Sequence, residues 1–441
     1  MAGAPLAALT HRAGPADAHC CLCATKSGRD EASLPHRPGG PMKAILVSAI
    51  GFSVAAVAWA CTETATEIVI PTGVQLAPSD TTIPQRHSMQ LVASVVDTAG
   101  KPISGVQPSF TSSDPLVLQV SATGLVTSVG PLGAATITAK FATFMAFAHV
   151  TVRDSNIVER LPLSGRPFDA EISPSGVIYV TRLDVGLVSR LNLAERAFTA
   201  SVVVGSVPSR VTFNASGSTA YVSNQFSQDV GIINVSTNTQ TDVIPTTGDP
   251  GPVALSIDGA ALFVTTNANR LYRFSLASRA STDSLGLPAT SHHLVVHPGG
   301  NLLYVATREG GSVLEADART LAVTRTFTLG GRTNGMVLSP DHGTLYVAND
   351  YLSLIHVITL STGSVGSIAL SGGPFALGLG PDGTRVYATL TFDGKVQVVD
   401  RASRHVIQTI ETGGAPRLPV ADAAQGLVVV PNEAGWVDVL R

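Results

Sequence analysis

The chain has 441 residues, and only 13% of them are charged, against about 25% in an average soluble protein. Its formal net charge of −3 at pH 7 offers no positive excess, so nucleic acid is not an expected partner. The 42 glycines and 27 prolines are typical of a turn-rich, all-β, exported protein. The length exceeds one ordinary domain and suits one domain plus a repeat array.

The first 41 residues contain three of the four cysteines, Cys20, Cys21 and Cys23, while the fourth is Cys61. No cysteine occurs in the 380 residues after Cys61, so that region has no disulfide, thiol nucleophile or cysteine metal site. The cluster at 19–23 lacks a second ligand pair at zinc-finger spacing. We expect residues 1–41 to be a mis-assigned start or disordered, with Met1 or Met42 as the true first residue.

Residues 42–60 have the pattern of a secretory signal peptide. Lys43 supplies the positive charge, residues 44–59 form an apolar run too short for a confident membrane span, and Ala58-Trp59-Ala60 precedes Cys61. This segment resembles a bacterial lipoprotein signal, which implies a lipidated Cys61, with residues 61–71 serving as anchor and tether. The alternative is ordinary cleavage at the same bond. We expect a cell-envelope protein, or a secreted one without the lipid.

Residues 72–153 contain short alternating segments separated by turn residues. The expected strands cover 90–96, 117–120, 135–139 and 148–152, which favours a β-sandwich. Segments 74–78, 110–115, 120–126 and 133–139 resemble bacterial immunoglobulin-like domains of group 2. The resemblance implies a spacer or adhesive module outside the cytoplasm, without chemistry of its own.

Seven apolar anchors, most of them aromatic, follow glycine-containing turns at nearly constant spacing. They are Tyr179, Tyr221, Phe263, Tyr304, Tyr346, Tyr387 and Val429, separated by 41 or 42 residues. Such a period indicates supersecondary units that bury their faces only against one another. With about four strands per period, the pattern predicts a seven-bladed β-propeller over residues 157–441.

One repeat unit can be divided into expected strands at 321–329, 335–339, 344–348 and 354–360. Tyr346-Val347-Ala348-Asn349 and Tyr221-Val222-Ser223-Asn224 resemble the YVTN repeat of bacterial surface propellers. That family consists mostly of surface-layer or periplasmic proteins of unassigned activity. Its fold resembles that of lactonase-type propellers. Because the chain ends after a third strand, we expect residues 157–163 to supply the outer strand of the last blade.

Positions that differ between blades are free to serve function. Residues entering the innermost strands, commonly after a proline, are expected to meet at one mouth of the central channel. The candidates for a ligand-binding rim are Asp169, Arg210, His292, His293, Asn334 and Arg417. The alternative is a solvated rim that bonds to backbone. We expect the neighbours Asp169 and Arg210 to form an ion pair rather than a catalytic dyad.

No catalytic signature occurs in the sequence. Adjacent strand residues such as His292 and His293 point to opposite faces, which disfavours one shared metal ion. No Gly-x-Ser-x-Gly elbow or phosphate-binding glycine loop is present, so no catalytic residue, metal or cofactor is expected. The favoured function is binding of a protein, small molecule or carbohydrate at the propeller mouth. The alternative is a lactonase-type or lyase-type enzyme at the same mouth.

Overall fold

The computed structural model describes residues 69–441, which form 37 β-strands. The expected signal peptide at 42–60, Cys61 and the doubtful segment 1–41 lie outside the described residues. Across residues 69–441, no helix is long and apolar enough to reach from one side of a membrane to the other.

The N-terminal part, up to Arg153, contains nine strands in three small sheets. The strands are β1 (Gly73–Ala77), β2 (Asp80–Pro84), β3 (Ser88–Gln90), β4 (Val92–Val96), β5 (Ser109–Ser112), β6 (Leu118–Val120), β7 (Leu125–Ser128), β8 (Gly133–Phe141) and β9 (Phe144–Arg153). The sheet orders are β1-β4, β2-β9-β8-β5 and β3-β7-β6. Leu91, Leu118 and Ile137 are buried in its core.

One expected strand of this part, at 90–96, is divided in two. The backbone N–H of Leu91 donates to the carbonyl of Gly124 at 2.9 Å, outside the ladders of β3 and β4. Before Leu91 the chain belongs to the β3-β7-β6 sheet, and after it the chain pairs with β1. The segment predicted as one strand at 90–96 therefore spans a change of sheet.

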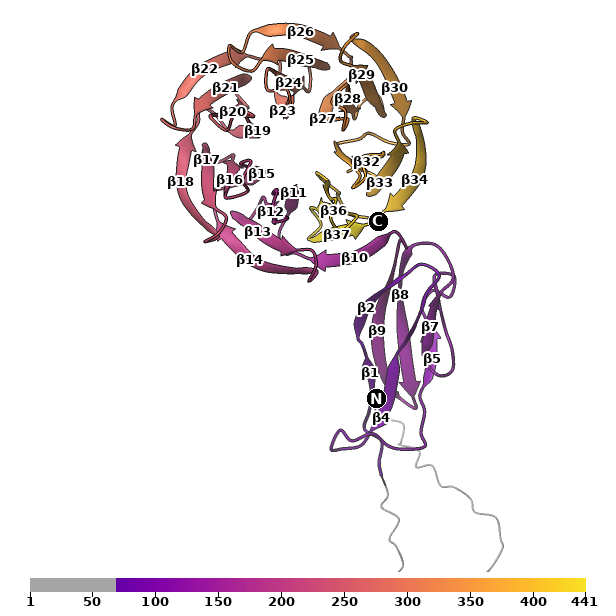
Figure 1. Cartoon of the computed structure of the whole chain (residues 1–441). Coiled ribbons are helices and arrows are strands. Elements are labelled where there is room, and N and C mark those ends of the chain that lie inside the picture. The colour runs from indigo at the N-terminus through magenta and orange to yellow at the C-terminus, as the bar shows by residue number, and fades with distance from the viewer. Residues whose placement is uncertain (1–68) are drawn as a thin grey trace, which may run out of the picture. The chain divides into compact units, whose positions relative to one another are not determined.

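Seven four-stranded antiparallel sheets follow and are arranged in a ring as a seven-bladed propeller (Figure 1). Blade 1 consists of β11 (Pro167–Ile172), β12 (Ile178–Arg182), β13 (Leu187–Asn192) and β14 (Ala197–Val203). Blade 2 consists of β15 (Pro208–Phe213), β16 (Thr219–Asn224), β17 (Asp229–Asn234) and β18 (Thr239–Pro245). Blade 3 consists of β19 (Pro250–Leu255), β20 (Ala261–Thr266), β21 (Arg270–Ser275) and β22 (Ser281–Gly286).

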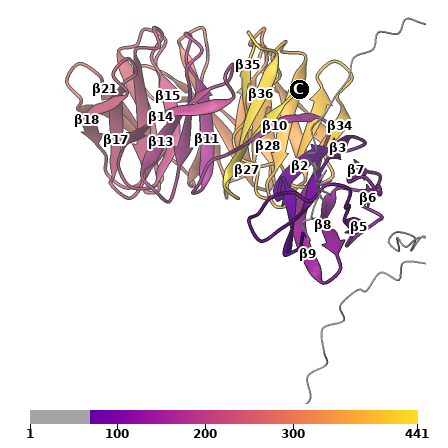
Figure 2. The ribbon, with the colours of Figure 1, turned by 90° about the horizontal axis from the view of Figure 1, so that it is seen from below.

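Blade 4 consists of β23 (Ser291–Val296), β24 (Leu302–Thr307), β25 (Ser312–Asp317) and β26 (Val323–Thr328). Blade 5 consists of β27 (Thr333–Leu338), β28 (Thr344–Asn349), β29 (Leu354–Thr359) and β30 (Ser364–Ala369). Blade 6 consists of β31 (Ala376–Leu379), β32 (Arg385–Leu390), β33 (Lys395–Asp400) and β34 (His405–Glu411). The first strand of each blade lies toward the centre, and the fourth lies outside. Figure 2 shows the ring of blades from the side.

Blade 7 combines strands from both ends of the propeller. Its order is β10 (Ile157–Pro162), β37 (Trp436–Leu440), β36 (Leu427–Asn432) and β35 (Val420–Asp422). Strand β10 runs antiparallel to β37, from the pair Ile157–Leu440 to the pair Pro162–Trp436. Segment 157–162 is thus the outermost strand of the last blade and closes the ring.

The buried anchors explain why the period is so regular. Tyr179, Phe263 and Val429 are completely buried on the second strands of their blades. Tyr179, for example, packs in one cluster with Val211 and Val222 of the next blade. Each anchor therefore fills the gap between two neighbouring sheets, and the same geometry returns every 41 or 42 residues.

The innermost strands are irregular where they begin. Register shifts separate Pro167 from Ala170, Pro208 from Arg210 and Ser291 from His293 in their pairing with the second strands. Such bulges change the direction in which side chains point. They decide which of the candidate rim residues face the mouth and which face deeper into the channel.

A candidate binding site at the propeller mouth

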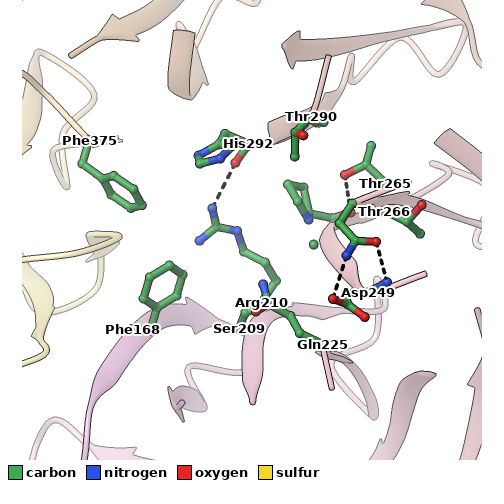
Figure 3. A pocket seen from close by; sticks show the side chains of 14 residues that line it. Phe168, Ser209, Arg210, Gln225, Asp249, Thr265, Thr266, Thr290, His292 and Phe375 are labelled. Atoms are coloured by element: carbon green, nitrogen blue, oxygen red, sulfur yellow. Dashed lines mark hydrogen bonds between the residues drawn. The ribbon is translucent and has the colours of Figure 1, made fainter. Parts of the chain in front are cut away.

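A cavity of about 190 Å³ lies at the mouth of the channel, on the side where the innermost strands begin. Phe168, Arg210, His292 and Phe375 line it together with several hydroxyl-bearing side chains (Figure 3). A second cavity of about 430 Å³ lies among the innermost strands and is lined by Asp169, Glu171 and His293. Four of the six predicted rim residues thus line one or both of these cavities, whereas Asn334 and Arg417 line neither.

Arg210 lines both cavities. Its side chain extends from β15, and Nη2 donates to the backbone carbonyl of His292 at 3.0 Å. Its guanidinium carbon lies 5.3 Å from the ring centre of Phe168. The buried Nη1 has no hydrogen-bond partner among the described residues. Arg210 is therefore fixed at one end and retains a donor for a ligand.

Two phenylalanines and Arg417 form one side of the mouth. The rings of Phe168 and Phe375 meet edge to face, with centres 6.0 Å apart. The guanidinium of Arg417 lies 4.4 Å from the centre of Phe375 and 5.2 Å from that of Phe168, and it also forms an ion pair with Glu433. Cation–π contacts of this kind hold the two rings in place at the wall of the cavity.

Arg308, which the sequence analysis missed, connects two predicted rim residues. Its Nη1 lies 3.2 Å from Nδ1 of His292 and 3.0 Å from Oδ1 of Asn334. Its Nη2 donates to Asp350 at 2.9 Å. Arg308 belongs to the loop after the second strand of blade 4, whereas the predicted rim residues all lie at the starts of innermost strands. The available signal was a lone arginine directly after a buried strand.

Both histidines are neutral at pH 7. Burial, followed by the charges of Arg308 and Arg210, lowers the pKa of His292 to about 4. Burial, Arg210 and His292 lower the pKa of His293 to about 3. His292 faces the mouth cavity and His293 the deeper channel, as expected for neighbours on a strand.

The acidic groups lie deeper in the channel. Oδ2 of Asp169 accepts a hydrogen bond from the backbone N–H of Val211 at 2.9 Å. Burial raises the pKa of Asp169 to about 6, and burial together with the charge of Asp169 raises the pKa of Glu171 to about 8. The expected ion pair between Asp169 and Arg210 does not form within 4.0 Å, because the backbone of β15 takes up the carboxylate.

The mouth cavity therefore presents hydrogen-bond donors and aromatic rings. Besides Nη1 of Arg210, the buried hydroxyls of Ser209 and Thr266 have no partner in the described part of the chain. Among residues 69–441, no group of three or more His, Cys, Asp or Glu side chains is placed to hold a metal ion. The arrangement suits recognition of a group rich in acceptor atoms.

These features define a β-propeller protein with a preformed cavity at one mouth. No protein-family model matches the chain. The chain is 23% identical over 248 residues to Antigen Lp49 of Leptospira interrogans, covering 51% of this chain and 54% of that protein. It thus spans about half the length of this curated relative.

A solved structure with a similar fold is the hydrazine synthase of Kuenenia stuttgartiensis. The TM-score is 0.58 at 16% identity, over 65% of this chain and 98% of that chain. At this identity the likeness concerns the fold alone, and it supports the propeller architecture described above.

Proposed function

We propose that this chain is an exported binding protein of the bacterial cell envelope, which holds a partner at the propeller mouth and catalyses no reaction. In this proposal, Cys61 carries a lipid anchor and residues 72–153 form an immunoglobulin-like spacer. YVTN-type repeats build the propeller. The similarity to Antigen Lp49 supports a location at the cell surface.

The observation that carries the proposal is how the polar groups at the mouth are used. The guanidinium of Arg308 already contacts His292, Asn334 and Asp350. His292 is neutral and shares its Nδ1 with Arg308. An active site needs an acid, a base or a nucleophile converging within about 3 Å of one reacting atom. The mouth instead offers donors, a cation and two rings, which are the means of recognition.

The alternative, a propeller enzyme of lactonase or lyase type, is favoured by one observation. Asp169 and Glu171 have pKa values raised to about 6 and about 8, a range suited to general acid–base catalysis near neutral pH. Both line the deeper channel, which Arg210 separates from the mouth cavity. A substrate at the mouth would have to pass Arg210 to reach them.

A two-part experiment separates these functions. The full chain, purified after processing by a bacterial host, is first tested for turnover of a lactone panel with and without divalent metal ions. We expect no turnover. Saturable hydrolysis that disappears in Asp169→Asn or Glu171→Gln would establish the enzyme instead.

In the second part, organic acids, sugars and peptides are screened for an increase in melting temperature. We expect stabilising compounds whose effect is lost in Arg210→Met. A complete lack of stabilisation by all three classes would argue against binding at the mouth.

A further inference from the structure

The loops between the second and third strands surround the mouth cavity. Gln225 and Asn267, from two of these loops, line the cavity directly. The second residue of each loop repeats around the ring as Asp184, Phe226, Ala268, Glu309, Tyr351, Phe392 and Ala434. Because each loop follows a strand that ends on the mouth side, these residues form one ring of loop tips on one face of the propeller.

Three of these tips are exposed aromatic side chains. Phe226, Tyr351 and Phe392 are 72%, 70% and 84% exposed. Among the propeller residues that the structure describes, no other Phe, Tyr or Trp is exposed. Val185 and Leu352, at the next position of two loops, add further exposed apolar surface. Three exposed aromatic side chains on the face that carries the cavity favour an interaction surface there.

The size of the cavity indicates what enters it. Its volume of about 190 Å³ is below the ~300–1,000 Å³ of typical small-molecule pockets. A space of this size accommodates one side chain. A small polar cavity on a face with three aromatic loop tips therefore fits a protein partner. Such a partner would insert one side chain into the cavity and pack neighbouring apolar residues on the tips.

The mouth cavity also indicates the chemistry of the inserted residue. Within residues 69–441, the side-chain groups at the cavity without a hydrogen-bond partner are Nη1 of Arg210 and the hydroxyls of Ser209 and Thr266, all of which can donate. Asp249, the one carboxylate among the described residues that line the cavity, accepts hydrogen bonds from Gln228 and Asn267. A carboxylate is the group that best satisfies a guanidinium together with two hydroxyls.

We propose that the mouth face docks a protein partner, which inserts an Asp or Glu side chain against Arg210 and packs apolar residues on Phe226, Tyr351 and Phe392. The proposal rests on the mouth being a binding site and names the class of partner. A free carboxylic acid could satisfy Arg210 equally well, but it would leave the aromatic tips without a role.

The test uses a phage-displayed peptide library panned against the full chain, and glutarate as the small carboxylate. We expect selected peptides with an acidic residue flanked by aromatic or aliphatic residues. In fluorescence anisotropy, the affinity of such a peptide should fall at least about tenfold in the triple variant Phe226→Ser/Tyr351→Ser/Phe392→Ser and in Arg210→Met. Ile257→Ser, 55% exposed on the opposite side of blade 3, should leave it unchanged.

Three outcomes would overturn the proposal. They are peptides without acidic enrichment, unchanged affinity in the triple variant, and an equal loss in Ile257→Ser. Glutarate bound through Arg210, together with selected peptides whose affinity does not change in the triple variant, would retain the mouth as a binding site and reject the protein partner. Because the tips are exposed, the triple variant keeps the test valid even if Arg210→Met fails to fold.

Discussion

Arg308 and Asp350 lie on neighbouring blades and form a salt bridge of 2.9 Å, in which the Asp350 side chain is only 3% exposed. Asp350 also accepts from Nε of Arg332 at 3.0 Å. Two guanidinium groups thus share one buried carboxylate at the mouth. This arrangement joins blades 4 and 5 and holds the side chain of Arg308 against His292 and Asn334.

Replacing Asp350 by Asn should destabilise the protein. The variant leaves the partly buried Arg308 without its counter-charge, and we expect a loss on the order of 3 kcal/mol. Urea unfolding measures the change. The matched control is Glu309→Gln, whose 62% exposed carboxylate lies 3.6 Å from the same arginine and should matter little. Equal losses in the two variants would contradict the importance of the buried bridge.

Glu171→Gln should stabilise the protein at high pH. The unfolded chain ionises Glu171 near pH 4.5, whereas the folded chain retains the proton up to about pH 8. The contribution of Glu171 to stability is therefore complete below pH 4.5 and is lost as the pH rises toward 8. The variant should exceed the melting temperature of the wild type more at pH 9 than at pH 5.

Calorimetry at both pH values gives the comparison for Glu171. The control is Glu195→Gln, at an exposed site in the loop between β13 and β14, which should follow the profile of the wild type. If the melting temperature of Glu171→Gln differs from that of the wild type by the same amount at both pH values, the folded protein does not retain a proton on Glu171.

Arg160→Met should weaken the closure of the ring. Nε of Arg160 bonds to Asp438 at 2.7 Å, and the side chain of Asp438 is completely buried. Without the arginine, the buried carboxylate of Asp438 retains the hydrogen bond from the indole N–H of Trp436, at 3.0 Å. We therefore expect the free energy of unfolding, measured by chemical denaturation, to fall by about 3 kcal/mol.

The control for ring closure is Arg196→Met. Arg196 pairs with Glu159 of the same strand β10 at 3.4 Å, and both side chains are exposed. We expect a change below about 1 kcal/mol. An Arg160→Met variant as stable as this control would show that the β10–β37 pair needs no ion pair.

Cys61→Ser tests the expected anchor. If Cys61 is lipidated, the chain expressed in a bacterium should incorporate labelled palmitate and sediment with membranes. The variant should be unlabelled, and either released or unprocessed, while Cys23→Ser should behave as the wild type. A soluble, unlabelled wild-type protein would favour ordinary secretory cleavage at this position.

The propeller was predictable because every blade repeats the same packing arrangement at a regular interval in the sequence. Tyr346 and Tyr387 occupy equivalent buried positions, and their spacing in the sequence is the spacing of the sheets. Strand ends were predictable to within about two residues in the unit around Tyr346. The change of sheet at Leu91 was not predictable, because a hydrogen bond to distant Gly124 determines it.

The site was less predictable than the fold, because contacts between blades decide it. Asp169 and Arg210 occupy the expected strand starts, but Asp169 bonds to the backbone of β15 instead of to Arg210. Arg308 reaches His292 from a different loop, so no rule based on one position of the repeat could find it. Tertiary contacts of this kind leave no periodic trace in the sequence.

The closing strand also has a consequence for biosynthesis. Strand β10 is the first strand of the propeller to be synthesised, and its partner β37 is the last. Until β37 has been synthesised, β10 is an unpaired edge strand that can pair with a neighbouring chain. Association between chains through this edge is therefore a greater hazard for the incomplete chain than for the finished propeller.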